Sequence, residues 1–194
     1  MTLIVNRESL TTDSRHTSPS FVANSGSQAL IGVDDPLPQI GYGAQKLRDG
    51  KVYAIGVVND FASPLADGAS IDIGIAWNAG VTPTVSFFGL CAGDAVGFLY
   101  ESASLSGGTA ATAVKLNRNS TIASQSAITV GPTVSNVGTL VLKQILIGGT
   151  GKKAGGGEVG SSNLILTPLT SYLIRLTNVN GAAHAAELIV EWSE

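Results

Sequence analysis

The alternation of apolar and polar residues dominates the second part of the chain. Large apolar residues occupy every second position from Ile71 to Trp77, with Asp72, Gly74 and Ala76 between them. Successive side chains of an extended strand point to opposite faces, so this pattern predicts a strand with one buried face. We expect Trp77 to lie on that face.

Other segments show strand patterns of the same kind, separated by turn formers. They are strong at 51–58, 85–90, 96–101, 139–147 and 163–166, and weaker at 112–116 and 126–130. Many short strands without convincing amphipathic helices predict an all-β fold. We expect an antiparallel β-sandwich, with the jelly roll as the commonest way of arranging eight strands.

The end of the chain contains two further alternating segments. The first runs from Tyr172 to Leu176 and the second from Leu188 to Trp192, with Asn180-Gly181 between them. Asn-Gly is a strong hairpin signal because both residues tolerate a positive φ. The pattern predicts a C-terminal β-hairpin with Trp192 buried.

Residues 1–50 lack this regularity. They show little sustained periodicity and many turn formers, such as the Asp-Asp-Pro-Leu-Pro run at 34–38. Ordering such a polar segment costs roughly 1–2 kcal/mol per residue, so we expect another surface to hold it. The predicted organisation is an extended N-terminal arm at 1–50, with short strand or helical pieces, followed by a jelly-roll-like sandwich domain at 51–194.

Composition indicates a large core and a surface with few charges. Of the 194 residues, 44% are hydrophobic and only 13% are charged, against about 25% in average proteins. The net charge of −3 gives no electrostatic reason to expect nucleic acid or an anionic membrane as a partner. No run approaches the roughly 18 apolar residues of a spanning helix, and the N-terminus does not resemble a signal peptide. We expect a soluble protein made in a cytoplasm.

Residues suited to catalysis or metal binding are few. Cys91 has no second cysteine to pair with, and we expect it to be a small buried residue. His16 and His184 have no metal-ligating neighbour at suitable spacing, and Asp67 and Asp94 lie beside glycines, where aspartate usually serves a turn. There is no Gly-x-Ser-x-Gly motif. We therefore predict no catalytic, cofactor-binding or metal-binding residues.

The glycine-rich segment 148–157 is the one candidate for a phosphate-binding loop. It contains Gly151-Lys152 and a G-x-G-x-x-A spacing, but Leu146 stands where a phosphate loop needs its first glycine. Lys153 stands where that motif needs Ser or Thr. Three consecutive glycines also disfavour the helix that such a loop requires. We interpret the segment as a flexible connection between strands.

Several blocks of the sequence resemble small virion proteins of tailed bacteriophages. The blocks are 85–101, 117–120, 166–178 and the closing Glu191-Trp192, within the part of the chain after Asp67. The resemblance implies a β-sandwich that decorates or cements the capsid, commonly as a homotrimer, with the major capsid protein as its partner. It implies a place on the capsid surface of the virion and no catalytic or cofactor residues.

Two other functions remain open at this point. A head-fibre or tail-tip protein would bind a host receptor or glycan, and such sites usually present exposed aromatic residues. The only two tryptophans, Trp77 and Trp192, are in register with buried faces. An enzyme such as a glycan hydrolase would need two converging carboxylates, and the sequence gives no sign that any two of the following converge: Glu101, Glu158, Glu187 and Glu191.

Overall fold

The computed structural model describes residues 20–22, 28–30, 42–147, 156–157 and 164–194. The chain divides into two compact units, Met1–Gly41 and Tyr42–Glu194. In the first unit, strands β1 (Ser20–Val22) and β2 (Gln28–Leu30) pair antiparallel. Most of the expected arm at 1–50, including His16, lies outside the described residues. Residues 42–50 belong to the second unit, which begins with helix α1 (Tyr42–Arg48).

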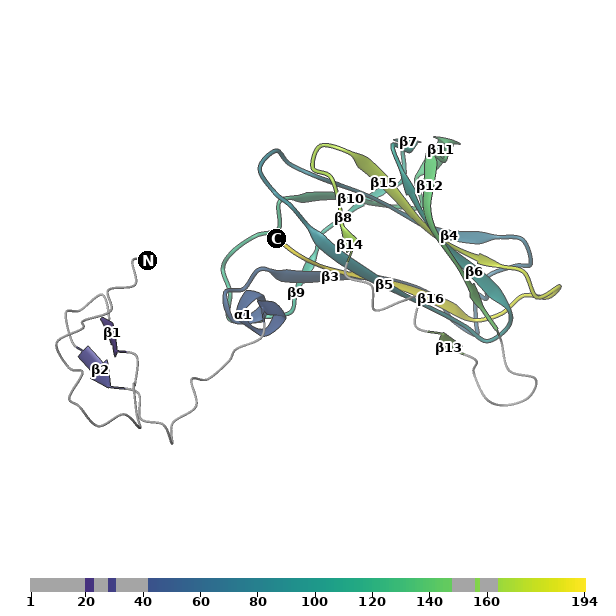
Figure 1. Cartoon of the computed structure of the whole chain (residues 1–194). Helices are drawn as coiled ribbons and strands as arrows, with labels where there is room; N and C mark the ends of the chain where they lie inside the picture. Colours follow the sequence, from purple (N-terminus) through teal and green to yellow (C-terminus); the bar gives the residue numbers. More distant parts are fainter. Residues whose placement is uncertain (1–19, 23–27, 31–41, 148–155, 158–163) are drawn as a thin grey trace, which may run out of the picture. The chain divides into compact units, whose positions relative to one another are not determined.

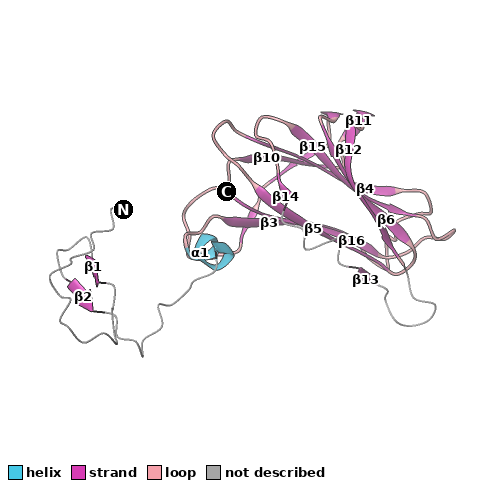
Figure 2. Cartoon of the chain, in the orientation of Figure 1, coloured by secondary structure: helices cyan, strands magenta, loops and turns pink. Residues whose placement is uncertain are grey.

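The second unit is an antiparallel β-sandwich, as the sequence predicts (Figure 1). Among its described residues, the regular secondary structure is strand apart from the single helix α1, which lies at one end of the sandwich (Figure 2). We call its two layers the β4 sheet and the β16 sheet after their central strands. In order, the β4 sheet contains β12 (Thr139–Leu146), β6 (Ala95–Glu101), β15 (Ser171–Asn178), β4 (Ser70–Trp77), β10 (Ser126–Val130) and β8 (Thr109–Ala111).

The β16 sheet is built around the last strand of the chain. In order it contains β13 (Gly156–Gly157), β5 (Thr84–Cys91), β16 (Ala186–Ser193), β3 (Val52–Asn59) and β9 (Val114–Lys115), and β14 (Leu164–Ile165) also pairs with β5. From β3 to β6 the consecutive long strands alternate between the two layers: β3 and β5 lie in the β16 sheet, whereas β4 and β6 lie in the β4 sheet. Neighbours along the chain therefore face one another across the core.

The predicted C-terminal hairpin is wrong. The strands β15 and β16 do form, but β15 pairs with β4 and β6 whereas β16 pairs with β3 and β5. Seven residues, Val179–Ala185, separate them, which is enough chain to pass between layers about 10 Å apart. Asn178 holds this crossing, because its buried side chain donates to the carbonyl oxygens of Leu65 and Ala182 at 2.9 and 2.7 Å. Gly181 has the positive φ expected of the Asn-Gly turn.

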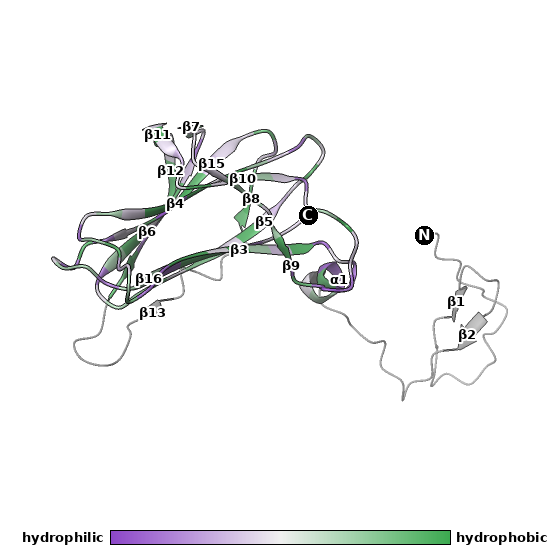
Figure 3. Ribbon diagram, turned by 180° about the vertical axis from the view of Figure 1, so that it is seen from behind, coloured by the Kyte–Doolittle hydropathy of each residue, from purple (hydrophilic) through white to green (hydrophobic). Residues whose placement is uncertain are grey.

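The core lies between the layers, where the apolar residues of each alternating strand meet. Hydrophobic residues recur along the strands of both layers (Figure 3), and buried residues alternate with half-buried ones along β6 and β16. Trp77 and Trp192 are both buried, as predicted, and their ring centroids lie 6.3 Å apart edge to face. Tyr53 stacks on Trp192 at 6.0 Å, and Tyr172 lies edge-on to Trp77 at 6.1 Å. Two strands of each sheet thus contribute to one aromatic cluster. Each such ring pair stabilises the fold by about 0.5–1.5 kcal/mol beyond the burial of its apolar area.

A small additional sheet covers part of the outer face of the β4 sheet. It pairs β7 (Ser104–Ser106) with β11 (Thr133–Asn136). A Cβ atom on Gly74 would lie 2.6 Å from Cδ1 of Leu105, so Leu105 lies directly over Gly74. Leu173, the neighbour of Gly74 in register, is fully buried although it alternates with the core-facing residues of β15. The part of this face on β6 and β12 is more open.

Candidate functional site

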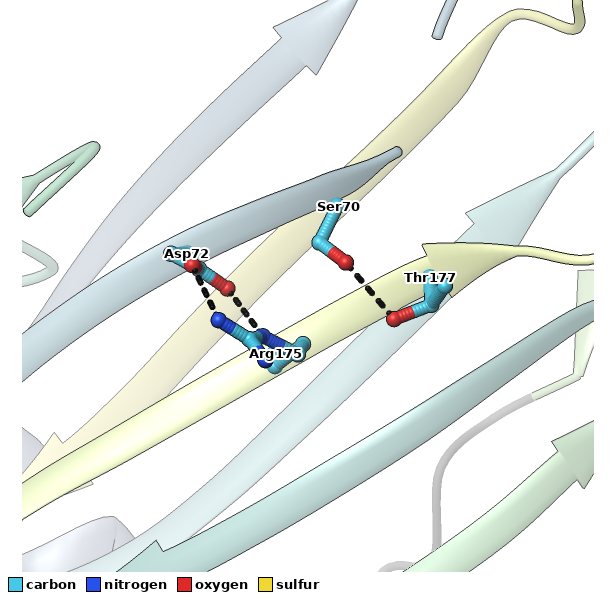
Figure 4. A network of polar contacts seen from close by, with 4 residues as sticks. All are labelled: Ser70, Asp72, Arg175 and Thr177. Carbon is cyan, nitrogen blue, oxygen red and sulfur yellow. Dashed lines mark hydrogen bonds and ion pairs between the residues drawn. The ribbon is translucent and has the colours of Figure 1, made fainter. Parts of the chain in front are cut away.

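The outer face of the β4 sheet carries a row of charged and aromatic side chains. Asp72, Arg175, Phe98 and Lys143 are successive cross-strand neighbours on β4, β15, β6 and β12. Arg175 donates two hydrogen bonds of 2.7 Å to Asp72 (Figure 4). These bonds raise the pKa of the Arg175 guanidinium, while its burial acts in the opposite direction. The Arg175 guanidinium is therefore charged at all ordinary pH values.

Two aromatic rings continue this row. Phe98 and Tyr100 stack with their centroids 5.6 Å apart, and Nζ of Lys143 lies 5.7 Å from the Phe98 ring centroid. Both rings are half-buried. The pair was not predicted, because only the tryptophans were weighed as ligand-binding aromatics. It was nevertheless predictable, since residues two apart on one strand point to the same face.

Strand β12, at the edge of the β4 sheet, presents exposed apolar side chains beside the row. The exposed fractions are 50% for Leu140, 67% for Ile145 and 79% for Ile147, which follows the strand. Leu140 pairs with Tyr100 and Ile145 pairs with Val96, so both share the outward direction of Lys143. A bulge between Leu140 and Leu142 brings Leu140 onto this side. We call Leu140, Lys143, Ile145 and Ile147 the edge stripe.

The outer face of the β16 sheet contains an apolar groove of about 320 Å³. Val58 and Leu90 lie on either side of Glu187 in one cross-strand row. Phe61, in the loop after β3, is 88% exposed and also lines the groove, while Val58 is 60% and Leu90 42% exposed. We call this site the apolar groove. The lining residues used below are Val58, Phe61, Leu90 and Glu187, and Ala92, Ala185 and Ala186 also line it.

A second groove, of about 380 Å³, lies where α1 meets the β16 sheet. Leu47 of α1 and Leu116 line it and are 41% and 39% exposed. The loop after β9 holds α1 in place, because Nδ2 of Asn117 donates to the carbonyl oxygen of Arg48 and Oγ of Ser120 to that of Gly50. We call this region the α1 end.

The last residue of the chain strengthens the α1 end. The Glu194 carboxylate accepts hydrogen bonds from Oγ of Ser124 at 2.5 Å and from the backbone amide of Gln125 at 2.9 and 3.1 Å. Nε1 of Trp192 donates to the same carboxylate at 3.1 Å, and Nζ of Lys46 donates to the backbone oxygen of Glu194. These contacts tie α1, the strand β16 and the loop before β10 together.

The crossing between β15 and β16 brings together three residues singled out from the sequence, Asp67, Asp94 and His184, and the Val179 amide in this crossing donates to the carbonyl oxygen of Asp94. Cys91 is buried in the core, as predicted, and forms part of the base of the apolar groove. Nε2 of His184 lies 2.6 Å from Nδ2 of Asn180. The Asp67 carboxylate accepts a hydrogen bond from the backbone amide of Gly181 and so stabilises the crossing between β15 and β16.

The glutamates considered as a possible catalytic pair lie in different parts of the sandwich. Glu101, in the β4 sheet, accepts a hydrogen bond of 2.8 Å from the Tyr172 hydroxyl, whereas Glu187 and Glu191 are on β16. Burial raises the pKa of the Tyr172 phenol, and the hydrogen bond to Glu101 raises it further. Glu158 and most of the glycine-rich segment 148–157 lie outside the described residues; Gly156 and Gly157 of that segment form β13.

Comparisons with known proteins leave the family open. No family model matches the chain, and no curated protein or solved structure matches it. Within the described ranges, no helix is long and apolar enough to cross a membrane. Among the same residues, no three His, Cys, Asp or Glu side chains are grouped so as to hold a metal ion. The exposed surfaces described above are therefore the basis for a functional proposal.

Proposed function

We propose that this chain is a structural virion protein of a tailed bacteriophage. It decorates or cements the capsid by bridging capsid subunits through non-covalent contacts, and the major capsid protein is its partner. The resemblance of residues 85–101 and 166–178 to such virion proteins motivates the proposal. The alternation of β3, β4, β5 and β6 between the layers supports a jelly-roll form of the sandwich.

The observation that carries the proposal is the exposed apolar surface of the α1 end. Leu47 and Leu116 line a groove there, and Val114 and Ile122 are 48% and 45% exposed on the neighbouring segments. Apolar side chains gathered around a groove are typical of a surface that a partner covers. Residues 1–41 directly precede α1 in the sequence, and we propose that they also contact the lattice. Repetition over the lattice multiplies weak single contacts.

Binding of the purified chain to capsids that lack it tests this proposal. Leu47→Ser with Leu116→Ser should weaken binding by at least about tenfold, because both side chains lose apolar contact area. Val179→Ser is the matched control: Val179 is 49% exposed but lies in the loop between β15 and β16, at the other end of the sandwich. Equal binding by the double variant and the intact chain would contradict the docking surface.

The contribution of the first unit is tested by deletion. A chain that lacks residues 1–41 should keep the β-rich circular dichroism of the sandwich, because the division between the two units falls at this point. Its attachment to capsids should be much weaker, since any contact made by the deleted residues is repeated at each lattice site. Undiminished attachment would remove the proposed role of this segment.

The Phe98–Tyr100 pair supports a second candidate, binding of a host receptor or glycan by a head fibre or tail tip. Stacked, half-buried rings beside Lys143 offer an apolar platform next to a cation. Under this proposal, Tyr100→Ala loses binding to host cells while capsid attachment is unchanged. The copy number per virion separates the two candidates, because a capsid lattice requires far more copies than a vertex or a tail tip.

A further inference from the structure

The edge stripe and the apolar groove have matching patterns of side chains. In the groove, the acidic residue Glu187 lies between Val58 and Leu90. In the stripe, the basic residue Lys143 lies between apolar neighbours that include Ile145. One surface is thus apolar and acidic at its centre, and the other is apolar and basic at its centre.

The spacings within the two patterns are similar in scale, although they are not equal. Neighbouring strands lie about 4.8 Å apart, so Val58 and Leu90 are each about this far from Glu187 across the sheet. Along β12, Ile145 is two residues from Lys143, which corresponds to about 6.7 Å. A strand β12 that crosses the groove can place Lys143 against Glu187 and Ile145 against one of its apolar walls.

The charges at the two centres lack partners of opposite sign within the described parts of the chain. Glu187 makes no side-chain hydrogen bond or ion pair there, and it is half-buried between its two apolar neighbours. Lys143 contacts the ring of Phe98 but no carboxylate among these residues. The nearby Asp60 is engaged with its own loop, because its Oδ1 accepts from the amides of Ala62 and Ser63. Glu187 is therefore the carboxylate left for a basic group that enters the groove.

The two surfaces of one molecule cannot meet each other. The stripe belongs to the outward side of the β4 sheet and the groove to the outward side of the β16 sheet, and these are the opposite faces of the sandwich (Figure 1). A molecule that uses both must contact two neighbours. Such head-to-tail contacts close into a ring of more than two copies or continue as a filament.

We propose that copies of this chain associate head to tail, with the edge stripe of one copy in the apolar groove of the next. Lys143 pairs with Glu187 of the neighbouring copy, and Ile145 and Ile147 cover Val58, Phe61 and Leu90. This inference goes beyond the proposed function, because it concerns contacts between copies of the chain and requires no capsid. The α1 end takes no part in these contacts and stays available for a different partner.

A charge-exchange experiment on the isolated full-length chain tests the association. The mass in solution is measured by analytical ultracentrifugation for the intact chain, Lys143→Glu, Glu187→Lys and the variant with both changes. Each single change places like charges together and should weaken association by at least about tenfold. The variant with both changes restores opposite charges at every contact and should associate almost as well as the intact chain.

Two further variants control the experiment. Arg118→Glu makes the same charge change as Lys143→Glu at an exposed position in the loop after β9 and should leave association unchanged. Ile145→Ser removes an apolar side chain that is 67% exposed, so it should weaken association without loss of folding. Near-ultraviolet circular dichroism verifies the fold of each variant.

Three results would overturn the inference. They are a monomeric intact chain, association that neither single charge change affects, and failure of the combined change to restore association. Loss of capsid binding on Glu187→Lys with a monomeric intact chain would assign the groove to the capsid instead. Conversely, normal association with no capsid binding contradicts only the proposed function.

Discussion

Arg175 and Asp72 form a bidentate ion pair across β15 and β4, with both hydrogen bonds 2.7 Å long. The side chains are only 24% and 14% exposed, respectively. Both charges are thus partly removed from water, and each depends on the other for solvation. The pair fixes the register of these two central strands. On the same face, a hydrogen bond of 2.7 Å between the hydroxyls of Ser70 and Thr177 also joins β4 to β15.

Arg175→Ala should lower the free energy of unfolding by about 1.5–3 kcal/mol, because it leaves the Asp72 carboxylate without its donors. Asp72→Ala with Arg175→Ala should cost less than the sum of the two single changes, since neither charge then remains unpaired. Urea denaturation of the four proteins measures this coupling. Strictly additive effects would mean that the pair contributes nothing beyond its separate side chains.

The two buried tryptophans should differ in their sensitivity to loss of the indole nitrogen. Nε1 of Trp192 donates to Glu194 at 3.1 Å, whereas Nε1 of Trp77 has no partner among the described residues. Trp192→Phe should therefore be more destabilising than Trp77→Phe by about 0.5–1.5 kcal/mol, the net value of a hydrogen bond. Thermal and urea unfolding of both variants provide the comparison. The reverse order would contradict the assigned role of Glu194.

Gly138 should tolerate substitution less well than Gly131. Both have positive φ values, +82° and +61°. A Cβ atom on Gly138 would lie 2.1 Å from the carbonyl oxygen of Glu101, whereas one on Gly131 would meet nothing within 4 Å. Gly138→Ala should thus cost about 1–3 kcal/mol more than Gly131→Ala. Chemical denaturation measures both, and equal costs would contradict the close approach of the turn before β12 to the end of β6.

High pH should destabilise the sandwich through its buried tyrosines. Burial raises the pKa of Tyr53 and Tyr172 above the ordinary value of 10.0, and the carboxylates of Glu194 and Glu101, respectively, raise it further. A raised pKa means that the folded state retains a proton that the unfolded state releases. The contribution of the two tyrosines to the free energy of unfolding is complete below pH 10.0 and is lost as the pH rises through their folded-state pKa values.

Unfolding measured at a series of pH values, together with tyrosinate absorbance, tests this expectation. Tyr172→Phe should show a shallower loss of stability above pH 10 than the intact chain, because only Tyr53 then contributes the effect. It should also be less stable at neutral pH, since the hydrogen bonds to Glu101 and from Thr167 are lost. Identical pH profiles for the two proteins would contradict the pKa shift of Tyr172.

Local sequence determined the strands themselves. The predicted strand at 126–130 is β10 residue for residue, and the alternation from Ile71 to Trp77 is β4 with its apolar residues buried. The burial of Cys91 was also predictable, because a lone cysteine behaves as a small apolar residue. Such patterns are readable because the period of two is a property of the extended backbone and does not depend on the partner strand.

The tertiary structure alone decided which strands pair. Asn180-Gly181 marks a change of direction correctly, but the turn leads to the opposite layer and the predicted hairpin does not form. The row from Asp72 to Lys143 draws on four strands, and the groove around Glu187 draws on three strands and their adjoining loops. Strand pairing depends on contacts between residues far apart in the chain, so a local pattern predicts a strand and its buried face but not its neighbours.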